Sequence, residues 1–121
     1  MARGTGIWIA RAAAGLEMLT GATLFAALSL LSELLFGSPM TAPGPTVGRV
    51  SGLAILGLAM GCWPRGITTH ALSGLWLLSA LVAAYMIWLG VNGGPVGVLF
   101  WPAVVAHLTL AVLLAAVWLK A

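Results

Sequence analysis

The chain has 121 residues, of which 62% are hydrophobic and only 6% charged, and its formal net charge is +3. Soluble domains contain about 25% charged residues. A chain this short buries only about two-thirds of its surface in water, so large apolar patches would stay exposed. The composition therefore excludes an ordinary soluble protein and predicts an integral membrane protein. The five basic residues are spread along the chain, which argues against a nucleic-acid partner.

Four apolar stretches follow one another, separated by segments rich in glycine and proline. Each is near the roughly 20 residues that a membrane-spanning helix requires. The first, residues 7–36, is longer than one straight span, so we expect it to tilt or protrude. Helices are also predicted over residues 47–63, 67–89 and 98–119. Because the connections are short, we expect an all-α fold, an antiparallel bundle of four transmembrane helices forming one domain over residues 1–121.

The second predicted helix is rich in glycine. It contains two successive G-x-x-x-G pairs, formed by Gly48, Gly52, Gly57 and Gly61. Glycines at this spacing let a neighbouring helix approach closely. We therefore predict that these four glycines are helix-packing positions and that the helix is packed on two sides.

The basic residues and the tryptophans indicate an orientation. Short cytoplasmic loops carry an excess of Lys and Arg, and Trp is enriched at membrane interfaces. One side of the predicted bundle has four basic residues, Arg3, Arg11, Arg65 and Lys120, together with Trp8, Trp63 and Trp118. The other side has Arg49, Glu33, Trp88 and Trp101. We therefore predict that both termini are cytoplasmic, in the inner membrane of a bacterium.

Three ionisable residues are the candidate functional site. At about 1.5 Å of rise per residue, Glu17 lies about 13 Å and His107 about 16 Å from the inner tryptophans of their helices. Arg49 lies about 21 Å from its own inner tryptophan, and its long side chain can reach towards the other two. An ionisable side chain at mid-membrane costs about 3 kcal/mol on insertion scales, which makes a Glu17, Arg49 and His107 cluster a candidate by default.

This cluster has two interpretations. It relays protons or holds a polar head group, or else Glu17 is neutral or paired with Arg49 and the pair only fixes helix register. The single cysteine, Cys62, excludes an internal disulfide and a Cys-x-x-Cys site. His70 and His107 differ in depth by roughly 10 Å, which argues against a pigment held by both. We predict no metal site and no catalytic residue.

Two segments carry a resemblance to a known family. Residues 46–65 (TVGRVSGLAILGLAMGCWPR) and 94–107 (GPVGVLFWPAVVAH), with the four-helix length, resemble the short DoxX-like integral membrane proteins of bacteria. Some members of that group are associated with quinone-linked oxidoreductase assemblies. The resemblance implies an accessory or anchoring role and identifies no catalytic residue in this chain.

A second resemblance is to small multidrug resistance transporters, which have four helices and an essential glutamate in the first. Glu17, within AGLEMLTGAT (residues 14–23), is similar to that glutamate. Residues 84–90 (AYMIWLG) are similar to part of that family's third helix, but here they end a helix instead of occupying its middle. This resemblance implies a proton-coupled small-molecule transporter that uses Glu17.

The favoured hypothesis is a non-catalytic accessory or structural subunit of a larger membrane complex, such as a respiratory or photosynthetic one. Its expected partners are membrane lipids and other membrane subunits. The alternatives are a membrane component of an oxidoreductase that binds quinone or lipid, and the proton-coupled transporter. A bound quinone, lipid or pigment is compatible with the first two.

Overall fold

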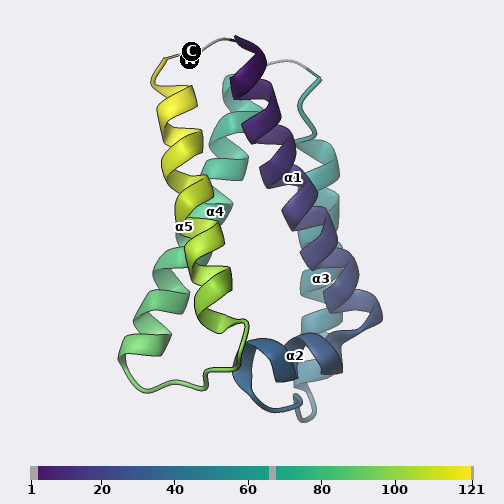
Figure 1. The fold of residues 1–121 in the computed structure, drawn as a ribbon. Helices are drawn as coiled ribbons and strands as arrows, with labels where there is room; N and C mark the ends of the chain where they lie inside the picture. The colour runs from purple at the N-terminus through teal and green to yellow at the C-terminus, as the bar shows by residue number, and fades with distance from the viewer. Residues whose placement is uncertain (1–2, 66–67, 121) are drawn as a thin grey trace.

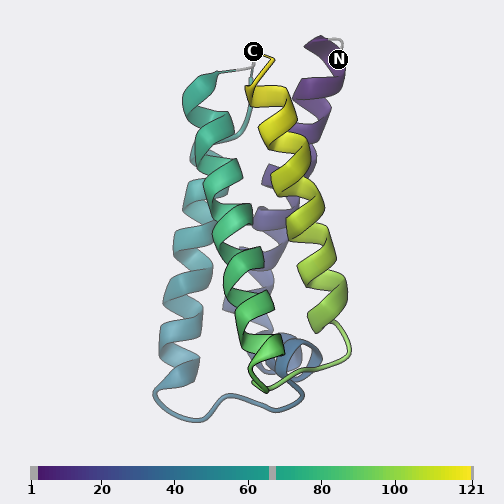
Figure 2. The same ribbon diagram turned by 90° about the vertical axis from the view of Figure 1, so that its left-hand side faces the viewer.

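The computed structural model describes residues 3–65 and 68–120. Within these residues the chain forms five helices, α1 (Arg3–Ala26), α2 (Leu28–Phe36), α3 (Gly44–Gly61), α4 (Thr69–Val91) and α5 (Phe100–Trp118). The four long helices run alternately up and down the molecule, and the short helix α2 lies across one end (Figures 1 and 2). The start of α1 and the end of α5 lie together at the opposite end. The prediction of an all-α fold is confirmed.

The helices differ in their suitability for crossing a membrane. In the described part of the chain, α4 and α5 are each long and apolar enough to span a bilayer, and α1 with α2 passes the same test as a bent pair. Helix α3 does not, because Arg49, Pro45 and several glycines lower its hydropathy. Two helices, or up to three, are therefore candidate spans. The predicted bundle of four transmembrane helices is not confirmed.

The outer surface supports membrane association. Large apolar side chains are exposed along all four long helices, including Leu19, Leu53, Leu81, Trp88 and Val112. Water would penalise such a surface, whereas lipid tails would not. The surface and the apolar helices together point to a protein of the membrane.

The stretch predicted as one helix over residues 7–36 is divided into two. The axes of its two parts form an angle of 114° at Ala27, whose φ of −135° and ψ of 45° are not helical. Ala27 makes one backbone hydrogen bond to each helix: its N–H donates to the Thr23 oxygen of α1, and its own oxygen accepts from the Leu31 N–H of α2. Neither glycine nor proline occurs there, so the local sequence does not encode the bend. The excess length of the stretch becomes α2.

Tertiary contacts hold α2 across the end of the molecule. Its last carbonyls accept hydrogen bonds from the loop before α5, with the Gly97 N–H 2.7 Å from the Leu35 oxygen and the Leu99 N–H 2.8 Å from the Leu34 oxygen. A Cβ on Gly97 would collide with the Leu34 and Glu33 carbonyl oxygens, so only glycine fits. Gly37 then ends α2 in the left-handed conformation, with φ of 74°.

Helices α1 and α3 pack closely through glycines. A Cβ built on Gly21 would lie 2.6 Å from the Gly52 carbonyl oxygen, and one built on Gly52 would lie 2.7 Å from the Gly21 oxygen. One turn away, a Cβ on Gly48 would meet the side chain of Leu28 at 2.8 Å. Gly48 and Gly52 are therefore packing positions, as the G-x-x-x-G pattern predicted.

The second glycine pair, Gly57 and Gly61, does not take part in this close packing. A Cβ on Gly57 or Gly61 would meet nothing within 4 Å in the described part of the chain. Gly57 follows Gly52 by five residues, which at 3.6 residues per turn rotates it about 140° around the helix. The two pairs therefore lie on different faces, and in the described part of the chain only the face with Gly48 and Gly52 packs closely against α1 and α2.

Two apolar clusters form the core. The first, near the end where α1 begins, joins α1, α4 and α5 and consists of Ala10, Ala13, Ala14, Leu72, Leu75, Leu114 and Val117. The second, near α2, consists of Met86, Phe100 and Val104, with Leu35 and Phe36 of α2 packed against it. Helix α4 pairs with α5 as α1 pairs with α3. The first cluster joins the two helix pairs through α1, and the second joins α4 and α5 to α2.

The remaining helix bounds differ from the predicted ones by one to three residues. Helix α3 begins at Gly44, with Pro45 in its first turn, where the missing N–H of proline does not matter. Helix α4 begins after Thr68, whose side chain accepts a hydrogen bond from the Ala71 N–H at 3.3 Å and so caps the helix. The predicted start of this helix, residue 67, lies outside the described residues.

Candidate functional site: a buried carboxyl-imidazole pair

Glu17 lies in the buried stripe of α1. The residues of this stripe, Ala10, Ala13, Ala14, Glu17 and Gly21, recur every three or four positions and therefore share one helix face. Glu17 is only 1% exposed. The small residues on either side leave its carboxyl group as the only large polar feature of this face. The helix thus directs a carboxyl group into the middle of the protein.

His107 occupies the matching place in α5. The buried residues of this helix, Phe100, Val104, His107, Ala111, Leu114 and Val117, also recur every three or four positions. His107 is 7% exposed. Both helices therefore present one ionisable side chain within an otherwise apolar stripe.

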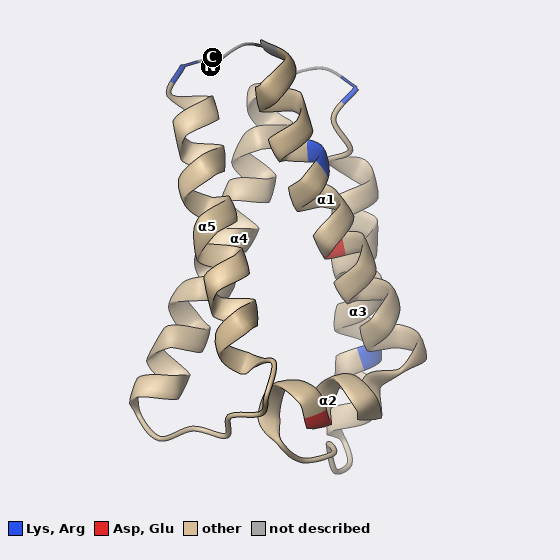
Figure 3. Ribbon diagram, in the orientation of Figure 1, with Lys and Arg blue, Asp and Glu red and all other residues tan. Residues whose placement is uncertain are grey.

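These two side chains meet across the helix pairs. The Nδ1 atom of His107 lies 3.3 Å from the Oε1 atom of Glu17. The alignment does not make a hydrogen bond, and both atoms lack any hydrogen-bond partner. Among residues 3–65 and 68–120 this is the only ion pair within 4 Å. The other charged residues lie towards the two ends of the molecule, and α3 carries a single one (Figure 3).

A third unpartnered polar atom belongs to α4. Ser79 is fully buried and its Oγ atom has no hydrogen-bond partner. Along α4 it falls between Leu75 of the first apolar cluster and Met86 of the second. Along α5, His107 falls between Leu114 and Val104 of the same clusters. Both residues therefore occupy the interval between the clusters.

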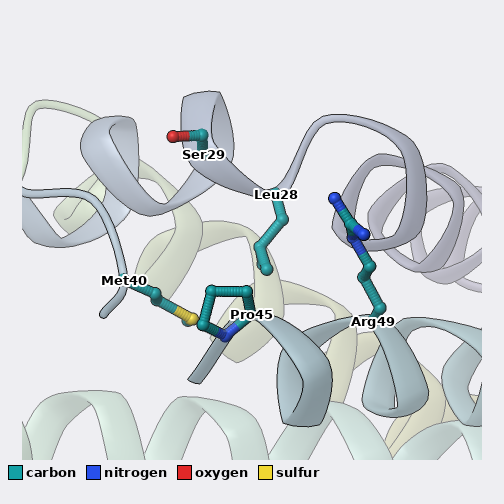
Figure 4. A pocket seen from close by; sticks show the side chains of 5 residues that line it. All are labelled: Leu28, Ser29, Met40, Pro45 and Arg49. Atoms are coloured by element: carbon teal, nitrogen blue, oxygen red, sulfur yellow. The ribbon is translucent and has the colours of Figure 1, made fainter. Parts of the chain in front are cut away.

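Arg49 does not join this pair. It is exposed on α3 and lines a pocket of about 240 Å³ with Leu28, Ser29, Met40 and Pro45. Figure 4 shows its guanidinium group extending from α3 towards the connection between α1 and α2. Arg49 follows Gly48 by one residue, so it points about 100° away from the glycine face that packs on α1 and α2. The candidate site therefore contains Glu17 and His107 and leaves Arg49 apart.

Three other polar or reactive side chains lie outside the site. His70 is exposed at the start of α4, and Tyr85 is exposed and stacked on Trp88 at a centroid distance of 5.9 Å. Cys62 is a free, half-buried cysteine beside Gly74. None of these three residues belongs to the ion pair that Glu17 and His107 form.

Sequence reasoning did not identify Ser79 or Gly21. A serine in a long apolar helix carries little signal, because a hydroxyl group can bond to the carbonyl one turn earlier, as Thr20 does. The spacing of Ser79 from Leu72, Leu75 and Met86 is the signal that could have placed it on the buried face. Gly21 continues the stripe of small residues on the buried face of α1, and this spacing is the signal that could have identified it.

The fold and the site define a helical protein suited to a membrane, with one buried carboxyl-imidazole pair between two helix pairs. No protein-family model, curated protein or solved structure matches the chain.

Proposed function

We propose that this protein is a non-catalytic subunit of a larger membrane assembly and that the outer face of α3 contacts a partner helix. The observation that carries the proposal is the one-sided packing of α3. Its inner face meets α1 and Leu28 of α2, whereas its outer face has open space at Gly57 and Gly61. The resemblance to DoxX-like proteins supports the same accessory role.

Glycine favours the association of helices within lipid. Lipid tails do not drive apolar helices together, so association depends on close van der Waals packing, which small residues permit. Gly57 and Gly61 lie one turn apart and form such a surface, while glycine inside a helix costs about 1 kcal/mol relative to alanine. A partner helix packed at these positions would offset that cost.

The test is purification of the full chain from its native membrane in mild detergent, followed by mass spectrometry of co-purifying proteins. We expect membrane proteins to co-purify with the wild type and to be lost in Gly57→Leu and Gly61→Leu. Gly4→Leu is the matched control, because Gly4 also has open space within 4 Å but lies in α1. Equal recovery of the same partners from all variants would refute the proposal.

A second candidate function, lipid binding, is favoured by the Arg49 pocket. Its lining combines three apolar residues, Leu28, Met40 and Pro45, with one hydroxyl and one guanidinium group. No carboxylate lies within 4 Å of Arg49 in the described part of the chain. This combination suits the phosphate and the first carbons of an anionic lipid, because arginine binds phosphate through parallel hydrogen bonds.

This candidate is tested by native mass spectrometry of the protein from nanodiscs. We expect phosphatidylglycerol to stay bound to the wild type and to be lost in Arg49→Gln, with phosphatidylcholine retained by neither. Arg65→Gln is the control, since Arg65 is exposed and does not line the pocket. Equal loss in both arginine variants would show nonspecific charge attraction, and free phosphate competing equally well would exclude a lipid-specific site.

A further inference from the structure

We propose that Glu17, Ser79 and His107 form a proton-exchange site around one buried water molecule, in which Glu17 and His107 share a single proton. This inference concerns the chemistry of the chain itself and goes beyond the proposed role in an assembly. The proton exchange needs only this chain, whereas the partner contact needs a second protein. An experiment on the isolated chain can therefore refute the exchange without affecting the proposed partner contact.

Three buried polar atoms, one each from Glu17, Ser79 and His107, have no hydrogen-bond partner. Buried polar groups in proteins almost always have a hydrogen-bond partner, which is often an ordered water molecule. In the described part of the chain, the buried polar or charged residues are Glu17, Ser32, Ser79 and His107. Ser32 donates a hydrogen bond to the Ser38 oxygen at 2.7 Å, whereas the other three each have an unpartnered atom. A shared group that both donates and accepts would satisfy all three.

The three residues also share one interval along the molecule. The three residues come from three different helices, and both Ser79 and His107 lie between the two apolar clusters. Within this interval the other buried residues of α4 and α5 are Ala83 and Ala111, which are small. Glu17 reaches the interval through its contact with His107. A water molecule there would be closed off at both ends by apolar side chains.

The pair can exchange a proton without any other reactant. In one state the Glu17 carboxylate faces a protonated His107 ring. The ring then gives its Nδ1 proton to the water, and the water gives one of its own protons to Glu17 Oε1. The products are a neutral carboxylic acid, a neutral imidazole and the same water. The net charge of the site is zero in both states, which suits a place from which bulk water is excluded.

Among the residues that the structure describes, no other charged side chain is buried beside this site. The buried residues of α3 are Gly48, Gly52 and Ala59, which carry no charge. On α4 the only buried polar residue is Ser79. On α1, Arg11 is engaged elsewhere, with its guanidinium over the Trp8 ring and its Nε donating to the Pro64 oxygen at 3.4 Å. The exchange therefore depends on the two ionisable residues and the hydroxyl group.

The composition simplifies the assignment of infrared bands to individual residues. The chain has only two side-chain carboxyl groups and only two histidines. Infrared difference spectra of the full chain in lipid, recorded between pH steps, report carboxyl protonation and imidazole protonation together. We expect one step in which a carboxyl band and an imidazole band change simultaneously. The band of the acid should be lost in Glu17→Gln and retained in Glu33→Gln, since Glu33 is exposed on α2.

Coupling is tested by changing the neighbours. His107→Gln should change the pH at which the carboxyl band changes, because groups that share a proton titrate as a pair. His70→Gln is the control, since His70 is exposed at the start of α4. Ser79→Ala should shift the same step and remove the band of a weakly bonded water O–H. Ser73→Ala is its control, because Ser73 bonds to the His70 oxygen of its own helix.

The outcomes separate the possibilities. A carboxyl step that keeps its pH in both His107→Gln and Ser79→Ala would overturn the proposal, because Glu17 would titrate alone. Absence of any Glu17 signal in the folded wild type would also overturn it and leave a pair that only fixes helix register. Circular dichroism of each variant confirms that it is folded. If His107→Gln does not fold, Ser79→Ala still decides, because it removes one hydroxyl group and leaves both ionisable residues in place.

Discussion

Gly21 of α1 and Gly52 of α3 lie face to face, so closely that a Cβ on either would come within 2.7 Å of the carbonyl oxygen of the other. Real Cβ atoms do not approach backbone atoms so closely, and backbone cannot move aside as a flexible side chain can. This contact sets the distance between α1 and α3. The carboxyl group of Glu17 lies one turn from Gly21 on the same face, so the contact also positions the candidate site.

The first prediction concerns this contact. Gly52→Ala should destabilise the protein by about 1–3 kcal/mol, the usual cost of forcing extra volume into a packed interface. Gly57→Ala is the matched control on the same helix, and it should be neutral or stabilising by up to about 1 kcal/mol, because alanine favours helix. Unfolding in mixed detergent, followed by circular dichroism, measures both. Equal stability of the two variants would contradict the close contact.

The second prediction concerns the pair. Glu17→Ala or His107→Ala should each destabilise the fold by about 3–5 kcal/mol, because removal of one side chain leaves the other buried without its counter-charge. The double variant should lose less than the sum, with an interaction of about 0.5–3 kcal/mol. Glu33→Ala should stay within about 0.5 kcal/mol of the wild type, because Glu33 is exposed. Strict additivity of the two single variants would argue that the residues do not interact.

The third prediction concerns α2. Gly97→Ala should loosen α2 from the end of the bundle, because the added methyl group collides with the Leu34 and Glu33 carbonyl oxygens. Hydrogen exchange should then accelerate in α2 and at the Leu99 N–H, with α4 little changed. Gly15→Ala, where the Cβ meets nothing within 4 Å, is the control. Unchanged protection of α2 in Gly97→Ala would show that these backbone bonds do not hold it.

The fourth prediction concerns orientation. We expect both ends of the chain to be cytoplasmic, because Arg11, Arg65 and Lys120 belong to the side that the basic residues mark. The start of α1 and the end of α5 do lie at one end of the molecule (Figure 2). An alkaline-phosphatase fusion after Lys120 should be inactive and a green-fluorescent-protein fusion there should fluoresce. The reverse pattern would invert the topology.

Part of this fold could be predicted from residue type alone. Long apolar stretches interrupted by glycine and proline indicate helices and a membrane environment, because helix propensity, hydropathy and chain breakers act over short distances. Thus α4 and α5 were found to within a few residues at each end. The spacing of Gly48 and Gly52 likewise predicted a close helix approach, since that depends on one helix face.

Other features depend on contacts between distant segments. The bend at Ala27 has no local signal, and α2 is held instead by Leu28 against Gly48 and by the backbone bonds from Gly97 and Leu99. A count of rise per residue gave similar depths for Glu17 and His107 and let the long side chain of Arg49 reach towards them, but depth does not specify direction around a helix. The rotation of α3, set by Gly52 against Gly21, turns Arg49 towards an outer pocket.

The sequence by itself thus determined the all-α character, the apolar surface and two mid-helix ionisable residues of opposite type, because these follow from composition and helical spacing. Only the tertiary structure decided which of them meet. Helix pairing and rotation brought Glu17 within 3.3 Å of His107 and placed Ser79 in the same interval between the apolar clusters. The physical reason is that each helix fixes its own buried face, whereas the choice of which faces oppose depends on backbone contacts such as that between Gly21 and Gly52.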